Sequence, residues 1–532
     1  MSNVTKPIIL DETGQAIRAV IKESASIIAD KIKGGGGKSS VVYGFHISSS
    51  EADPSAAVTY LKDAVGMTPA RMDYLNNKFY YGSWADAFFM PRPCMVAYNG
   101  TVDYYLDPDD YEKKENGEVS ALGDSTLGYG IKYQGNAMME WGRNEQQIWT
   151  KVVPDANDPY SGSVYIANKQ VDSNYVAWPF INNQGVLKTH FYTPIYNGSL
   201  TAYKVSSTTY YRLRSIPRRP VMNSPGNNSY DIPWDDATVD APGNLGSTLT
   251  QASHEVELAL NNNPNIDYTL NTTYPDETYF TNNRSSIGWF TEVYSDIQLI
   301  NNLLILIGKS LNTQEIFGNG NMSGNSYSSI GYQNNGVLYT GAHEYTTSGP
   351  NYSVLNKTGL FWGSNGDRYA VKVFGMENWW GNQWRRYAGH IGDTSAVTST
   401  YNHFIKNTFG KEDGSNCIGY STAKTGYIDT LCETVQGFKY IRANKFINTV
   451  TYGDKTYTIA NSLASNNSLP GTVGSGSYYC DYFYKSSDTH YAFRGGASWR
   501  GVTCGTFSVF AYAGFSDGNW GVGAALSFKP VS

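Results

Sequence analysis

The residues best suited to chemistry lie near the end of the chain, in a stretch with almost no charge. From Arg494 to Phe528 the sequence reads RGGASWRGVTCGTFSVFAYAGFSDGNWGVGAALSF. Trp, Tyr and Arg are the side chains most enriched at binding hot spots, and Gly, Ser and Asn supply adaptable hydrogen bonding. This mixture favours noncovalent recognition of a ligand. The same aromatic side chains could instead fill a buried β core, and both interpretations stay open at this point.

Sequence motifs for covalent or metal chemistry are weak. The cysteines, at 94, 417, 432, 480 and 504, are odd in number and widely spaced, so neither a disulfide framework nor a C-x-x-C metal pattern is evident. His254-Glu255 begins an H-E-x-x-H motif, but Leu258 occupies the second histidine position. The run GGGGKSS is not a phosphate-binding loop, because the first glycine of that pattern falls on Ile32. No G-x-S-x-G nucleophile elbow is present in a strand-to-helix setting.

Two further sites stay open as less favoured possibilities. The acidic loop LDPDDYEKKENGE, residues 106–118, could hold calcium, but it lacks the spacing of a helix-loop-helix calcium site. A solvated turn is the favoured interpretation. A pair of carboxylates for glycan hydrolysis forms in space rather than in sequence, so a depolymerase is not excluded.

Composition points to a large β-rich protein with many turns. The chain has 532 residues, of which 14% are aromatic and 16% charged, and it contains 54 glycines. This length predicts two to four domains. The net charge of -6, without a basic block, argues against a nucleic-acid partner. The first residues, MSNVTKPIILDETGQ, do not resemble a signal peptide, and no apolar run is long enough to insert into a membrane.

The N-terminal segment is expected to serve assembly. Apolar residues recur at helical spacing through residues 12–33 and are followed by four glycines. An isolated helix of this length is marginal in water unless its apolar stripe is covered. We therefore expect residues 1–37 to form a short helix for oligomerisation, most plausibly as a homotrimer, or for attachment to a larger particle. The alternative is a helix that packs back onto the following domain.

The rest of the chain is predicted to be α+β and rich in strands. Residues 38–135 are expected to form a mixed α/β spacer domain, with a strand at 41–48, a helix starting at Asp53-Pro54 and a hairpin at Asn99-Gly100. Successive strands follow in residues 136–216. Residues 293–307 give the strongest helical periodicity in the chain, and Gly308 ends it. Residues 217–285 and 316–356 lack periodicity and are expected to be long surface excursions or insertions.

Several of these segments together resemble a known family. The series is NAMMEWGRNEQQIWTKVV, RLRSI, FTEVYSDIQLINNLLILIGKSLNTQEIFG, VKVFGMENWWGNQWRR and the closing RGGASWRGVTCGTFSVF…WGVGAALSF. It resembles the C-terminal domain of phage tail-fibre and receptor-binding proteins with a C-type-lectin-like fold, whose fold relatives include formylglycine-generating enzymes. The start, VTKPIILDETG, is also similar to the start of phage fibre proteins. The resemblance covers residues 136–532 and implies a lectin-like ligand-binding domain with loop insertions at 217–285 and 316–356.

The resemblance also implies an alternation of scaffold and displayed positions in the closing block, which this family often diversifies with retroelements. The scaffold positions would be Gly495, Gly496, Gly501, Cys504, Gly505, Phe507, Gly523 and Leu526. The displayed, ligand-binding positions would be Ala497, Trp499, Arg500, Thr503, Ser508, Phe510, Tyr512, Ala513, Phe515, Asp517, Asn519 and Trp520. Strand alternation from Phe507 to Phe515 agrees in outline, with Phe507, Val509 and Leu526 expected in the core.

The implied function is attachment rather than catalysis. The copper-holding cysteine pair of the oxidase relatives would fall near Arg500 and Gly505, and Cys504 alone cannot form it. We therefore expect a virion adhesin, made in the host bacterial cytoplasm, that binds a host-surface protein or glycan and joins other virion proteins through its N-terminus. No catalytic residue, metal ligand or cofactor is assigned. The main alternative is a structural fibre, collar or capsid-decoration protein without a receptor role.

Overall fold

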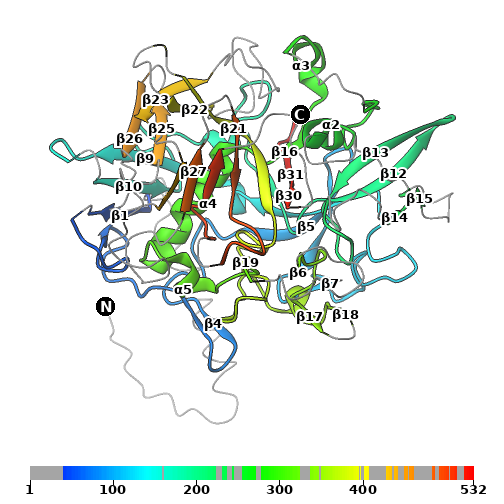
Figure 1. The fold of residues 1–532 in the computed structure, drawn as a ribbon, viewed down its shortest axis with the longest axis horizontal. Helices are drawn as coiled ribbons and strands as arrows, with labels where there is room; N and C mark the ends of the chain where they lie inside the picture. The colour runs from blue at the N-terminus through cyan, green and yellow to red at the C-terminus, as the bar shows by residue number, and fades with distance from the viewer. Residues whose placement is uncertain are drawn as a thin grey trace, which may run out of the picture. The chain divides into compact units, whose positions relative to one another are not determined.

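In a computed structural model of the protein, a set of ranges between residues 40 and 531 can be described. They are 40–48, 50–158, 161–222, 231–235, 243–244, 254–270, 277–323, 336–346, 349–394, 396, 401–406, 427–433, 437–440, 448–452, 455–459, 482–485, 490–501, 504–511 and 521–531. The predicted helix at 12–33 lies outside them. Residues from Val42 onward form one compact unit, which Figure 1 shows.

A four-stranded antiparallel sheet begins this unit. Its order is β2 (Val58–Lys62), β1 (Val42–Ile47), β10 (Gly162–Ala167) and β9 (Trp149–Pro154). The predicted strand at 41–48 is thus confirmed as β1. The helix predicted from Asp53 is wrong, because Asp53 Oδ1 accepts the backbone N–H groups of Ser55 and Ala56 only within a turn. The chain then enters β2, where Val58 and Tyr60 face the core.

A seven-stranded antiparallel sheet joins the middle of the chain to its end. Its order is β16 (Trp289–Thr291), β31 (Leu526–Phe528), β11 (Phe191–Pro194), β8 (Gly135–Trp141), β5 (Arg92–Ala97), β6 (Val102–Asp107) and β7 (Asp110–Lys114). The hairpin predicted at Asn99-Gly100 is confirmed between β5 and β6, where Gly100 has a φ of 86°. Strands from both sides of residue 135 share this sheet, so no separate spacer domain ends there.

An eight-stranded mixed sheet is built from the last third of the chain. Its order is β23 (Ile428–Glu433), β22 (Tyr401–Ile405), β21 (Trp384–Thr394), β28 (His490–Arg494), β29 (Val509–Ala511), β27 (Tyr482–Lys485) and β24 (Gly437–Tyr440), and β30 (Val522–Gly523) also pairs with β21. The pairs β27–β29 and β21–β30 are parallel. β28 leads into the closing block, and β29 and β30 lie within it.

Short hairpins and helices complete the described elements. The hairpins are β3 (Arg71–Asp73) with β4 (Lys78–Tyr80), β12 (Ser199–Val205) with β13 (Thr208–Arg214), β14 (Asp231–Ile232) with β15 (Gly243–Asn244), β17 (Glu344–Thr346) with β18 (Gly349–Asn351), β19 (Lys372–Val373) with β20 (Met376–Glu377), and β25 (Asn448–Tyr452) with β26 (Lys455–Ile459). The α-helices are α2 (Glu255–Leu260), α3 (Glu277–Asn283), α4 (Tyr294–Gly308) and α5 (Thr313–Phe317). The predicted β-rich α+β class is confirmed.

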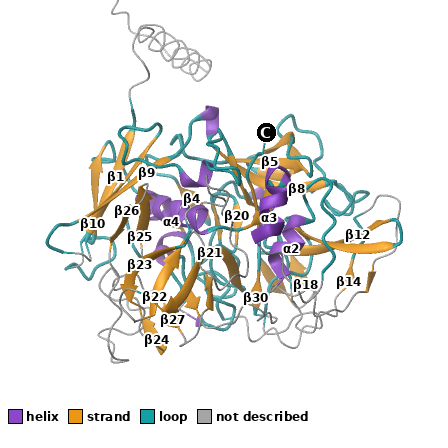
Figure 2. Cartoon of the chain, turned by 90° about the horizontal axis from the view of Figure 1, so that it is seen from above, coloured by secondary structure: helices purple, strands orange, loops and turns teal. Residues whose placement is uncertain are grey.

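The helix α4 lies at the centre of the core. It contacts β1 of the four-stranded sheet and β21 of the eight-stranded sheet, and Figure 2 shows it between strands of these two sheets. The predicted helix is confirmed, but every one of its residues is buried, not only the apolar stripe. Two of its polar residues bind side chains of the surrounding core: Asn301 Oδ1 accepts from Trp379 Nε1 at 3.0 Å, and Asp296 pairs with Lys529 at 2.8 Å. A helix covered on all sides fixes the elements around it.

The two predicted insertions are surface segments only in part where the structure describes them, and each also contains fully buried residues. In the first, Met222 and Ile232 are fully buried, as is all of α2. In the second, Val337 and Leu338 are fully buried. Low periodicity therefore does not by itself indicate a surface segment. No described helix is long and apolar enough to cross a membrane.

Candidate functional site

The closing block starts with two glycines whose backbone conformation strongly favours this residue type. Gly495 and Gly496 follow β28 with φ angles of 86° and 82°, in the left-handed region. A Cβ on Gly496 would lie 2.8 Å from Cys504 Cα. The Gly495 N–H donates to Ser508 O at 3.0 Å, which closes the turn onto the start of β29. The turn therefore requires both glycines.

The predicted scaffold positions form a buried frame beneath this turn. Cys504 and Leu526 are fully buried, and Phe507 is 1% exposed. Val509, which was also expected in the core, is 4% exposed. The Cys504 thiol donates to Ala497 O at 3.3 Å, and Cys94 and Cys504 are both buried free thiols. We call Gly495, Gly496, Cys504, Phe507 and Leu526 the buried frame. The predicted place of Phe507, Val509 and Leu526 in the core is confirmed, whereas Gly501, another predicted scaffold position, is half-buried.

A buried ion pair connects Arg494, at the start of the frame, to Glu292, just before α4. Arg494 Nη2 lies 2.7 Å from Glu292 Oε1, and Arg385 Nη1 lies 3.5 Å from the same oxygen. Arg494 also donates to Trp379 O at 2.8 Å, with its guanidinium 3.7 Å from the Trp379 ring centroid. Burial lowers the pKa of Arg494, while the Glu292 carboxylate raises it. Because all of these side chains are buried, the cluster serves the fold rather than a ligand.

Three half-buried side chains lie above the frame: Trp499, Arg500 and Phe510, which we call the aromatic face. The Phe510 ring lies 5.1 Å from the buried Trp384 ring and stacks on Phe493 of the neighbouring strand at 6.2 Å. The Arg500 guanidinium lies 5.6 Å from the Phe510 centroid. A cation at this distance from a ring is attracted by its π-electrons. The face thus presents aromatic edges and one charge on a rigid base.

The turn that carries this face is fixed by backbone hydrogen bonds. Ser498 N–H donates to Asn382 O at 3.0 Å, and Arg500 N–H donates to Ala497 O at 2.9 Å. Gly501 N–H donates to Met322 O at 2.8 Å. The Trp499 indole rests against Gly521, where a Cβ would lie 2.9 Å from Cζ2 of the indole. Asn382, just before β21, and Met322, after α5, therefore both help to position Trp499 and Arg500.

The displayed positions predicted from the sequence divide into three groups. Trp499, Arg500 and Phe510 are half-buried. The Arg500 guanidinium lies beside the Phe510 ring, and Trp499 and Phe510 pack against the same buried cluster. Ala497 and Ser508 are fully buried, so their predicted display is wrong. The other displayed positions lie outside the described residues: Thr503, Tyr512, Ala513, Phe515, Asp517, Asn519 and Trp520.

The error at Ala497 and Ser508 has a physical cause. Strand alternation was expected from Phe507, but β29 begins only at Val509. Residues before it lie in turns, where successive side chains do not alternate between two faces. Ser508 is buried because its backbone closes the turn with Gly495 and Gly505.

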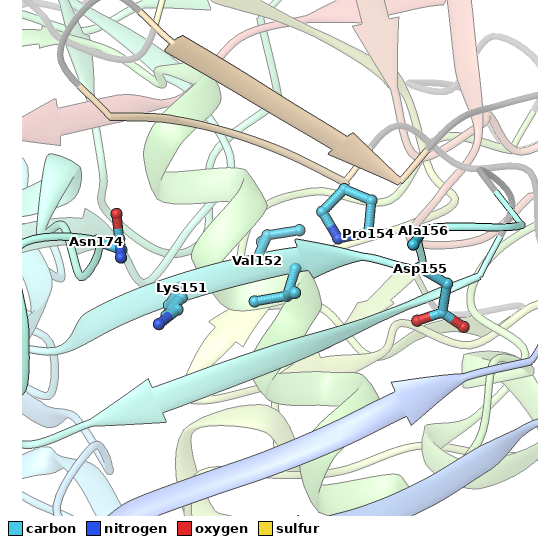
Figure 3. A pocket seen from close by; sticks show the side chains of 7 residues that line it. Lys151, Val152, Pro154, Asp155, Ala156 and Asn174 are labelled. Atoms are coloured by element: carbon cyan, nitrogen blue, oxygen red, sulfur yellow. The ribbon is translucent and has the colours of Figure 1, made fainter.

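A hollow of about 460 Å³ lies along β9, at the edge of the four-stranded sheet (Figure 3). Figure 3 shows Lys151 and Asn174 at one end of it and Asp155 at the other. Lys151 Nζ is paired with Asp172 at 3.0 Å, and Asp155 is paired with His46 at 3.0 Å. Its charges are thus already engaged within the fold, and Val152 and Pro154 give it a mainly apolar floor.

Two neighbouring carboxyl groups, those of Glu255 and Glu257, have a raised pKa, but both are buried. Burial raises the pKa of Glu255 to about 7, although Arg386 lies 2.5 Å away. His254 Nδ1 lies 3.1 Å from Glu257, whose pKa is also raised by burial. Neither Glu255 nor Glu257 is more than 1% exposed, and neither lines the hollow at β9.

The acidic loop after β6 forms a tight turn. Asp107 Oδ1 accepts the backbone N–H groups of Asp109 and Asp110, and Lys113 pairs with Asp110 at 3.0 Å. In the described ranges, no three His, Cys, Asp or Glu side chains gather as a metal site would require. The predicted turn is thus found only around Asp107–Asp110, because Asp110–Lys114 continue as β7 with Tyr111 fully buried.

A scan of the chain against models of known protein families gives no match, and no curated protein matches its sequence.

Proposed function

We propose that this chain is a phage virion adhesin that recognises a host-surface ligand through the aromatic face of its closing block. The observation that carries the proposal is the arrangement of Trp499, Arg500 and Phe510. All three are half-buried. Trp499 and Arg500 lie on a turn that several backbone hydrogen bonds hold in place, and Phe510 lies in β29. A rigid turn loses little conformational entropy when it binds, which favours affinity.

The chemistry of the face suits recognition. Trp and Arg supply contact area and a cation, and the ring of Phe510 gives an apolar surface beside them. A purely structural fibre protein has no need for such a group at a fixed surface turn. The proposal includes a C-type-lectin-like fold for residues 136–532. It also includes assembly as a trimer and virion attachment through residues 1–37, so that several weak sites act together.

The proposal is tested with fluorescently labelled protein and the bacterial host on which a phage carrying it grows. Arg500→Ala is expected to lower cell binding at least about tenfold, because a hot-spot arginine contributes 1.4 kcal/mol or more. The matched control is Arg92→Ala. Arg92 also lies over a ring, 3.3 Å from the Tyr105 centroid, but it belongs to β5. Equal binding by both variants would refute the role of the aromatic face.

A further inference from the structure

A second hollow of about 460 Å³ lies where β7, β18 and the 3-10 helix at Leu355–Lys357 meet. It shares no residue with the aromatic face. Its polar lining includes Glu112, Arg218, Asn351, Tyr352, Ser353 and Lys357. We propose that this hollow, the Glu112 pocket, binds an acidic monosaccharide unit, which carries a carboxylate beside hydroxyl groups.

The charges of the pocket favour an anion that also donates hydrogen bonds. Glu112 lies between two cations: its Oε1 is 3.3 Å from Arg218 Nη2, and its Oε2 is 3.0 Å from Lys357 Nζ. These three side chains sum to one positive charge. Lys357 remains 48% exposed, so its ammonium has donors left for a ligand carboxylate. Because Glu112 would repel a bare anion, the ligand must also bring hydroxyl groups that donate to this carboxylate.

Arg218 is held in an unusual conformation at the wall of the pocket. Its φ is 62°, in the left-handed region that a side-chain-bearing residue rarely occupies. Its backbone N–H donates to Thr340 O at 2.7 Å, and its guanidinium lies 4.0 Å from the Tyr129 centroid and 5.1 Å from that of Tyr352. Its buried Nε has no hydrogen-bond partner in the structure described here. Backbone strain of this kind is concentrated at ligand-binding sites.

The remaining lining side chains suit a sugar ring. Ser353 Oγ donates to Asn351 Oδ1 at 2.7 Å, and Asn351 Nδ2 donates to Glu344 at 3.1 Å, so the amide is fixed in orientation. Burial raises the pKa of Tyr352, which keeps its phenol neutral beside the pocket. Sites for small polar ligands combine an aromatic surface with a few placed polar groups in this way.

An amino acid is the nearest competing ligand, because its ammonium could pair with Glu112. The two cations already beside this carboxylate would repel a third, whereas a hydroxyl group donates to it without adding charge. The arrangement therefore favours a carboxylated sugar over a zwitterion.

The test is calorimetric titration of the full chain with sodium glucuronate, glucose and alanine. Glucuronate is expected to bind with a Kd on the order of 1 mM, and glucose and alanine at least about tenfold more weakly. Lys357→Gln is expected to weaken glucuronate binding about tenfold through the loss of one charge-assisted hydrogen bond. Lys151→Gln, which breaks the exposed pair with Asp172, is the matched control and should leave binding unchanged.

Four results would overturn the proposal: no glucuronate binding, equal binding of glucose, equal binding of alanine, or no effect of Lys357→Gln. Arg218→Lys gives a second check, because it keeps the charge but removes the planar fork, and it should also weaken glucuronate binding. None of these measurements involves host cells, so failure here is distinguishable from failure of the adhesin proposal.

Discussion

Arg494 Nη2 lies 2.7 Å from Glu292 Oε1, and both side chains are almost completely buried. This pair connects two parts of the chain that are 202 residues apart. Arg494 is the residue directly before Gly495 and Gly496, so the pair fixes the point from which the closing block starts. The aromatic face thus depends on an interaction that no ligand can reach.

Breaking this pair should strongly destabilise the protein. Glu292→Gln leaves Arg494 and Arg385 buried without their carboxylate, and we expect the apparent free energy of unfolding in guanidinium chloride to fall by about 3–5 kcal/mol. Glu115→Gln is the control, because it breaks the exposed pair with Arg92 and should cost at most about 1 kcal/mol. Similar losses in both variants would contradict the structural role of Glu292.

Substitutions at Gly501 and Gly496 distinguish the cost of backbone strain from the cost of steric overlap. Gly501→Ala places a Cβ in open space at a φ of 58°, so it should cost about 1 kcal/mol through strain alone. Gly496→Ala adds overlap with Cys504 and should cost about 1–3 kcal/mol more. Chemical denaturation of both variants checks this order. If Gly501→Ala were the more damaging, the packing described for Gly496 would be incorrect.

His390 should make stability depend on pH. Burial lowers its pKa to about 3, and its Nδ1 lies 2.6 Å from the Tyr387 hydroxyl. In the unfolded chain its pKa is about 6.5, so the unfolded state takes up a proton that the folded state does not. The stability associated with His390 is complete above pH 6.5 and is lost as the pH falls from 6.5 toward 3.

The matched variant for this prediction is His390→Gln, which cannot titrate. Between pH 6.5 and 5, the parent should lose about 2 kcal/mol more unfolding free energy than the variant. Parallel pH profiles of unfolding would show that His390 is protonated to the same extent in the folded and unfolded states.

Gly521 should control the position of the Trp499 indole. Gly521→Ala introduces a Cβ 2.9 Å from Cζ2 of this indole, so the ring must move. If Trp499 contacts the ligand, this substitution lowers cell binding by the labelled protein, but it has no further effect when combined with Trp499→Ala. Additive losses in the double variant would mean that Gly521 acts on binding through another residue.

Sequence reasoning succeeded where a local pattern determines structure. The helical spacing in 293–307 predicted α4, and Asn99-Gly100 predicted the β5–β6 hairpin, because each signal depends on neighbours in the chain. The helix predicted from Asp53 was wrong. Asp53 caps only a turn, and the residues that follow form β2, which pairs with β1. Long-range pairing also removed the expected boundary at 135, because β5, which precedes it, pairs with β8, which follows it.

The candidate sites were predictable only in part. Residue types favoured Trp499 and Arg500 as contact residues. The resemblance added Phe510, but it also implied display of Ala497 and Ser508, which are fully buried. The Glu112 pocket was missed because Glu112, Arg218 and Lys357 come from three distant segments. The sequence shows that residues 215–220 are basic and that the acidic loop carries Glu112. Nothing in the spacing of these segments indicates that Arg218 and Glu112 lie close together.

The most direct test of the central claim is the adsorption rate of phage particles that carry Trp499→Ala and Arg500→Ala in this protein. Tyr512→Ala with Trp520→Ala tests the neighbouring positions in the same way. The adhesin proposal predicts that adsorption to host cells is abolished while the thermal unfolding transition of the purified protein is retained. Normal adsorption by particles that carry the Trp499 and Arg500 substitutions would contradict it.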